Sequence, residues 1–229
     1  MTVLAAATRI VELGGARERQ AAVGALRARF EGRTGAFAPD DAWFEERSRA
    51  FWCDALTRGR FGREVAADLT PAERRWLGPL ERAHRGLFRV AVAAEEGPAG
   101  RTLVDVWSGA QLVPTVIDEE SGAELSASAG QLFDGRVVGA GEPFVLALLP
   151  GAVFHPRHAT PAIEGVIAAA RSKDLTTDDT LDALLRMERS LRALSRVKAA
   201  YAYRLEALAL PEAHGAAQRP VRRAAKSPT

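Results

Sequence analysis

Short runs of alternating apolar and polar residues, each bounded by Gly, Pro, Asp or Ser, fill the middle of this chain from Gly86 to Pro156. This period of two residues is typical of half-buried strands separated by turns. The segments on both sides of this stretch have a helical pattern instead. The predicted strands are 86–92, 102–107, 111–117, 131–138, 143–149 and 152–154.

Two of these segments, 102–107 and 111–117, are joined through Ser108-Gly109, which predicts a hairpin with a tight turn. Pro114 cannot donate a hydrogen bond to a central ladder, so the second strand of the hairpin is expected at an edge or a bulge. We interpret Asp118-Glu119-Glu120 as a solvated turn and expect no helix between the strands. Because parallel crossovers need a dozen or more residues, the sequence predicts antiparallel neighbours in a small meander or barrel.

Residues 1–80 are predicted to be a helical region. Apolar residues recur at helical spacing on both sides of Gly14-Gly15, which indicates two short amphipathic helices. A third helix is expected to be capped by Asp40 or Asp41. Tryptophans at helical spacing are far more often core than ligand-stacking, so we interpret those of this region as core. They are Trp43, Trp52 and Trp76.

The segment Thr70-Pro71-Ala72-Glu73 carries the signature of a capping box, in which Thr70 and Glu73 satisfy each other's backbone N–H groups. It predicts a short helix from Pro71 to Leu77, ending at Gly78-Pro79. The chain as a whole is therefore expected to be α+β. It has a helical N-terminal region, a small β module over 86–156 and C-terminal amphipathic helices that pack on the rest.

The C-terminal helices are expected over 160–210. Thr176 or Thr177 is predicted to cap a long helix that persists to about Leu208 and is bent near Ser195. One side of this helix is apolar, and the other carries a basic row. Such a row is usually the solvated face, and phosphate binding is the alternative. The row consists of Arg189, Arg192, Arg196 and Tyr203.

Lys198 falls within the predicted apolar side of this helix. A buried lysine with a lowered pKa can act as a base or a nucleophile, and this is the one position where the sequence motivates chemistry. The structural alternative, which we favour, is a side chain that snorkels to water or a change of helix register near Ser195.

Residues 211–229 lack apolar spacing, and we expect them to form a disordered basic tail. Its charge is about +3, and since the whole chain is formally +2, the body is nearly neutral. The body therefore lacks the large basic footprint of a dedicated nucleic-acid domain, and any such binding would use local arginine clusters or the tail. The tail residues considered for this role are Arg219, Arg222 and Arg223.

Residues 103–109, 129–139 and 144–146 together give the 101–150 region a likeness to a known module. The region resembles the small β module that accompanies SEC-C zinc motifs in uncharacterised bacterial proteins. The resemblance implies a fold and no activity. SEC-C motifs need several cysteines, whereas this chain has only Cys53, so no zinc site is carried over.

No local motif predicts catalysis, a cofactor or a metal ion. His155 and His158 lack a carboxylate or thiolate that would complete a ligand set, and Cys53 has no local His partner. One cysteine excludes an intramolecular disulfide and is consistent with a reducing compartment. With no signal peptide or membrane-spanning segment predicted, we expect a cytoplasmic location. Enrichment in alanine and arginine suggests a G+C-rich bacterial genome.

Three hypotheses for function follow. The favoured one is a non-catalytic interaction or regulatory protein with an unknown protein partner, because no catalytic spacing is present. The second is a protein that associates with nucleic acid through the β module, the arginine row and the tail. The third is an enzyme with an unrecognised site, for which Lys198 is the candidate.

Overall fold

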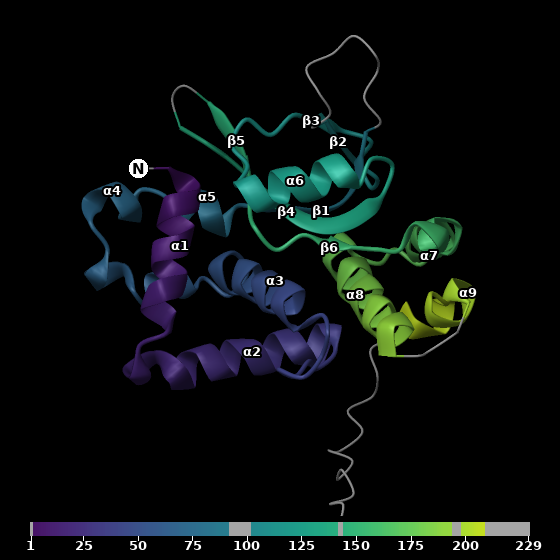
Figure 1. The fold of residues 1–229 in the computed structure, drawn as a ribbon, viewed down its shortest axis with the longest axis horizontal. Helices are drawn as coiled ribbons and strands as arrows, with labels where there is room; N and C mark the ends of the chain where they lie inside the picture. The colour runs from purple at the N-terminus through teal and green to yellow at the C-terminus, as the bar shows by residue number, and fades with distance from the viewer. Residues whose placement is uncertain (1, 92–101, 142–143, 194–197, 209–229) are drawn as a thin grey trace, which may run out of the picture.

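A curled antiparallel sheet occupies the middle of the chain, and helices from both ends of the sequence pack on its outer side (Figure 1). The computed structural model describes residues 2–91, 102–141, 144–193 and 198–208. The α+β prediction is confirmed. The strands are β1 (His84–Val90), β2 (Leu103–Asp105), β3 (Gln111–Leu112), β4 (Leu132–Ala140), β5 (Val145–Leu148) and β6 (Val153–Phe154).

The order of strands along the sheet is β3-β2-β1-β4-β5, and all neighbours are antiparallel as predicted. Strand β6 continues along the same edge of β4 as β5, with Phe154 opposite Phe133. The predicted hairpin is confirmed as β2 and β3. Strand β3 lies at the edge of the sheet and ends before Pro114, as the missing proline donor requires.

The sheet curls into a half-barrel, and one isolated bridge connects its two edges. Val116, four residues beyond β3, forms a parallel bridge with Ala147 of β5 at the opposite edge. The Leu148 N–H donates to the Val116 carbonyl at 3.0 Å. The barrel interior is filled by side chains rather than hollow. The rings of Phe88, Phe133 and Phe154 pack in series at centroid distances of 5.5 and 5.0 Å.

A helix that the sequence analysis missed covers this interior. Helix α6 (Glu119–Ala127) begins where a solvated turn was expected, because the Asp118 carboxylate accepts a hydrogen bond from the Ser121 N–H at 3.0 Å. Leu125 of α6 is 1% exposed and packs on the barrel's phenylalanines. The expectation of no helix between the strands was therefore wrong, although the strands are antiparallel.

The N-terminal region is helical, as predicted, and its helices break at Gly14-Gly15. The capping box of Thr70 and Glu73 is present with both of its hydrogen bonds. The predicted stop at Gly78-Pro79 was wrong, because a separate helix runs through these two residues. The helices are α1 (Val3–Gly14), α2 (Gln20–Thr34), α3 (Phe44–Leu56), α4 (Pro71–Arg74) and α5 (Leu77–Glu81).

The predicted aspartate cap of α3 was also wrong. Trp43 precedes the helix without a capping side chain, and the Asp41 carboxylate accepts instead from the Ala38 N–H at 2.7 Å. The interpretation of the tryptophans as core holds for Trp76, which is 8% exposed, while Trp43 and Trp52 are half-buried against the same apolar cluster.

The C-terminal region consists of α7 (Thr160–Ser172), α8 (Thr177–Ala193) and α9 (Ala199–Ala202). Thr176 caps α8, since its hydroxyl accepts from the Asp179 N–H at 3.1 Å. The prediction of one helix to Leu208 was wrong: α8 ends at Ala193, Lys198 has extended backbone, and the chain resumes in α9. The bend expected at Ser195 lies outside the described residues.

The sheet and the N-terminal helices share one apolar core. Val138, Leu149 and Val153 belong to the same buried cluster as Ile10 of α1 and Phe51 of α3. A second cluster joins Leu87 and Leu132 on the outer face of the sheet to α7 and α8. None of the helices in the described part of the chain has the length and apolar content that crossing a membrane would require.

Replacing Leu125 by alanine should destabilise the protein, because it removes the side chain with which α6 fills the barrel interior. Loss of a buried leucine leaves a cavity, and we expect the free energy of unfolding to fall by about 2 to 5 kcal/mol in urea denaturation. Ala123→Ser, at an exposed position of the same helix, is the control and should change it by about 0.5 kcal/mol or less. Equal effects of the two substitutions would contradict the packing of α6.

Candidate anion-binding site

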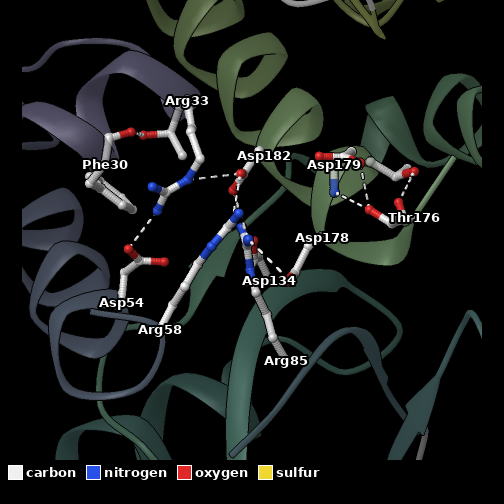
Figure 2. Close-up of polar contacts among 12 residues, drawn as sticks. Phe30, Arg33, Asp54, Arg58, Arg85, Asp134, Thr176, Asp178, Asp179 and Asp182 are labelled. Atoms are coloured by element: carbon white, nitrogen blue, oxygen red, sulfur yellow. Dashed lines mark hydrogen bonds and ion pairs between the residues drawn. The ribbon is translucent and has the colours of Figure 1, made fainter. Parts of the chain in front are cut away.

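A buried carboxylate on α8 brings three arginines together beneath the sheet. Figure 2 shows the guanidinium groups of Arg33, Arg58 and Arg85 converging on Asp182. Their nitrogens lie 3.0, 3.2 and 2.7 Å from the Asp182 carboxylate oxygens. Arg33 comes from α2, Arg58 follows α3 and Arg85 lies on β1, so this one side chain links the helical region, the sheet and the C-terminal helix.

Two further buried aspartates complete the network. Asp54 of α3 accepts from Arg33 at 2.6 Å and from Arg136 of β4 at 2.9 Å. Asp134, also on β4, pairs with Arg85 in a bidentate manner at 2.6 and 3.2 Å. Paired, hydrogen-bonded geometry of this kind is what allows charges to be buried.

The charges of the network hold one another in the ionised form. Burial disfavours the charged form of Asp182, but the adjacent Arg85, with Arg33 and Arg58, outweighs it and lowers the pKa of this carboxyl. Burial likewise opposes the charge of Arg85, and Asp134 and Asp182 overcome it and raise its pKa. Arg85 therefore stays charged and is held at a fixed position by the two aspartates.

An open pocket of about 430 Å³ adjoins this network. Its lining combines buried guanidiniums with exposed ones: Arg85 and Arg136 are buried, whereas Arg58 and Arg82 reach solvent. Within the described residues, Arg82 forms no ion pair. The lining residues are Thr57, Arg58, Glu81, Arg82, Ala83, His84, Arg85, Arg136 and Asp178.

The carboxylates that line the pocket already have cationic partners. Glu81 receives two hydrogen bonds from Arg63, at 2.6 and 2.5 Å. Asp178 lies 3.7 Å from Arg85. The pocket thus offers an incoming ligand at least one guanidinium without a carboxylate partner, which suits a carboxylate or phosphate.

His84 lines the same pocket and is held by Asp105, whose Oδ2 lies 3.1 Å from the imidazole Nε2. The same Oδ2 accepts from the Ser108 hydroxyl at 2.7 Å. This is not a catalytic triad, because Ser108 donates to the carboxylate and not to the imidazole. His84 is therefore not placed to activate Ser108.

The basic row predicted on the C-terminal helix is largely engaged inside the protein. Arg189 donates to the Ala36 carbonyl, and Arg192 pairs with Glu46 at 2.7 Å and with Glu188. Tyr203, expected on the solvated side, is only 3% exposed, and its hydroxyl lies 2.7 Å from Nδ1 of His155. Its inclusion in the row was wrong because the helix ends before it. Arg196, Arg219, Arg222 and Arg223 lie outside the described residues.

Lys198 is exposed at the start of α9. The less favoured hypothesis of a buried lysine was therefore wrong. The favoured alternative, a side chain that reaches water, agrees with the exposed position, because the chain is no longer helical at Lys198. The expectation that the histidines hold no metal ion remains a prediction. Within the residues that the structure describes, no three His, Cys, Asp or Glu side chains gather around a point where a metal ion would fit.

None of the arginines that line the pocket was predicted as a site residue from the sequence. In an arginine-rich chain a single arginine has no local signature. A signal was nevertheless present in the predicted strand 131–138, where Asp134 and Arg136 occupy alternate positions and residues 132–138 are otherwise apolar or glycine. Charged side chains on one face of a buried strand need partners of opposite charge, which indicates a buried network.

Comparison with known proteins found no matching family model, and neither the curated proteins nor the solved structures gave a match. The likeness of residues 101–150 to the β module of SEC-C proteins therefore stays a prediction.

Asp182→Asn should strongly destabilise the protein, because it keeps the shape of the side chain but leaves three guanidiniums facing a neutral amide. Removing one partner of a buried ion pair typically costs about 3 to 5 kcal/mol, and chemical denaturation at pH 7 should show a loss of this size. Glu164→Gln, which breaks the exposed pair with Arg89, is the control and should cost about 1 kcal/mol or less. Similar losses in both variants would contradict the central position of Asp182.

Stability should fall as the pH is lowered below about 6.5, because burial lowers the pKa of His155 to about 4 while the unfolded histidine keeps an ordinary value near 6.5. The neutral folded form loses its advantage as the unfolded chain takes up a proton. From pH 7 to 5.5 this one group should remove about 1 kcal/mol. In urea denaturation, the His155→Gln variant should not show this loss of stability between pH 7 and 5.5. The His158→Gln variant, changed at an exposed position, should still show it.

Proposed function

We propose that this protein is a non-catalytic binding protein whose arginine-lined pocket recognises a phosphate group on its ligand or partner. The observation that carries the proposal is the position of Arg82. It lines the 430 Å³ pocket beside three other arginines and has no ion-pair partner among the described residues. Arginine presents a planar fork of N–H donors that matches the oxygens of a phosphate.

Binding is favoured over catalysis because arginines dominate the pocket, and its one histidine, His84, is hydrogen-bonded to Asp105 and not to a nucleophile among the described residues. Guanidinium groups stay protonated and cannot take up a proton from a substrate. Cys53 is 3% exposed, and burial raises the pKa of its thiol to about 12, so it is not a thiolate nucleophile at neutral pH. Lys198 is solvent-exposed and belongs to no site described here.

The buried arginines of the network support the pocket rather than occupy it. Arg85 and Arg136 are fixed by Asp134 and Asp54, so they supply positive charge at the pocket wall without having to be ordered by the ligand. A site whose donors are already fixed loses less conformational entropy on binding. Arg58, with its side chain 43% exposed and one contact to Asp182, can turn part of its donor set to the ligand.

The nucleic-acid hypothesis receives less support. Arg189 and Arg192, which would have formed the phosphate-binding row, are engaged with Ala36, Glu46 and Glu188. The remaining arginines of that hypothesis lie outside the described residues.

Inorganic phosphate should bind to the protein saturably and raise its melting temperature when ionic strength is held constant with chloride. Arg82→Ala should weaken phosphate binding about tenfold or more in isothermal titration calorimetry, since a charge-assisted hydrogen bond contributes about 1.5 to 3 kcal/mol. Arg89→Ala removes the same charge from a residue of β1 that does not line the pocket, and it should leave the affinity unchanged. Equal binding by Arg82→Ala and the wild type would refute the site.

A further inference from the structure

A second hollow adjoins the arginine network on the side of α2. Its volume is about 260 Å³, and it is lined by Leu26, Arg29, Arg33, Asp54, Arg58 and Gly59. Arg58 lines both this hollow and the 430 Å³ pocket. The two spaces are thus neighbours that share one guanidinium, itself anchored on Asp182 at 3.2 Å.

The second hollow has its own guanidinium without a carboxylate partner. Arg29 is exposed on α2, and within the described part of the chain it forms no ion pair. Its backbone carbonyl accepts from Arg33 at 3.2 Å, and within the same described residues the Arg29 side chain donates no hydrogen bond. Asp54, the carboxylate of this hollow, is already shared by Arg33 and Arg136.

The same pattern therefore occurs on both sides of Arg58. Each hollow has arginines paired with aspartates, and each has one exposed arginine without an ion-pair partner among the described residues: Arg29 on one side and Arg82 on the other. The ion pairs leave two positive charges unmatched, separated by Arg58. A ligand with one anionic group satisfies only one of them.

We propose that the ligand is a small molecule that carries two phosphate groups, one bound by Arg82, the other by Arg29, with Arg58 between them. This inference rests on the proposed phosphate-binding function and specifies its ligand class. The open pocket of about 430 Å³ is within the volume range of small-molecule sites, and the adjoining hollow adds about 260 Å³. The second hollow also has an apolar wall in Leu26 and Gly59, which suits the carbon skeleton that joins two phosphates.

The absence of a side chain at Gly59 allows its backbone to lie close to Leu26 of α2. A Cβ atom at Gly59 would lie 2.7 Å from the Leu26 side chain and 2.8 Å from the Ala55 carbonyl oxygen, both too close for contact. The backbone at Gly59 can thus form the floor of the hollow against Leu26 without a side chain intruding.

The test compares two matched ligands on the full chain. Fructose 1,6-bisphosphate and fructose 6-phosphate differ in one phosphate, and calorimetry at constant ionic strength should show that the bisphosphate binds at least tenfold more tightly. Arg29→Ala should abolish most of this difference while changing the affinity for fructose 6-phosphate by less than about twofold. Arg82→Ala should weaken the binding of both ligands, and Arg89→Ala should affect neither. Because Arg29 and Arg82 are exposed, these variants should retain the wild-type fold, which circular dichroism checks.

The outcomes separate the two proposals. If the monophosphate binds through Arg82 but the bisphosphate gains nothing, or if Arg29→Ala leaves the gain intact, the two-phosphate ligand is wrong and the phosphate site stands. If neither sugar phosphate binds and Arg82→Ala has no effect, the phosphate site itself is wrong. A single-stranded oligonucleotide that binds more tightly than the bisphosphate, with loss of binding in Arg29→Ala, would overturn the small-molecule class in favour of a nucleic-acid backbone.

Discussion

The contact of one aspartate with three arginines determines how this chain is assembled. Asp182 projects from α8 and pairs with Arg33 of α2, with Arg58 two residues beyond α3 and with Arg85 of β1. A buried carboxylate with fewer partners would be costly, and buried guanidiniums without it would be costlier still. The network therefore favours one placement of the C-terminal helix against the sheet, whatever net stability it contributes.

The same network prepares the pocket. Guanidiniums that are saturated by Asp54, Asp134 and Asp182 form its inner wall, and those without full partners lie toward solvent. This division of roles follows from burial. A desolvated charge must be paired inside the protein, whereas an exposed charge is solvated by water and can remain unpaired until a ligand binds. A binding site made in this way needs no motif of consecutive residues.

Much of the fold was predictable from the spacing of apolar residues and from the turn-forming residues between segments, whereas most of the site was not. The strands, the edge position before Pro114 and the capping box of Thr70 all depend on neighbours in the sequence, and the structure confirms them. Helix α6 was missed because its sequence is short and polar apart from one buried leucine. The capping residue Asp118 was the signal that could have indicated it. The ion pairs of the site join residues such as Arg85 and Asp182, which are 97 positions apart, and no local pattern specifies such a pair. The error at Lys198 came from extending a helical pattern across a break.

The buried arginines Arg85 and Arg136 are paired with carboxylates, and on our proposal the exposed arginines of the pocket are available to an anion. An NMR titration of the guanidinium Nε–H resonances in arginine-labelled protein with inorganic phosphate tests it most directly. We predict shifts that saturate with phosphate for Arg82 and Arg58, and unchanged resonances for Arg85, which is only 6% exposed in its side chain. Saturating shifts at Arg85 with none at Arg82, or no shift at any pocket arginine, would contradict it.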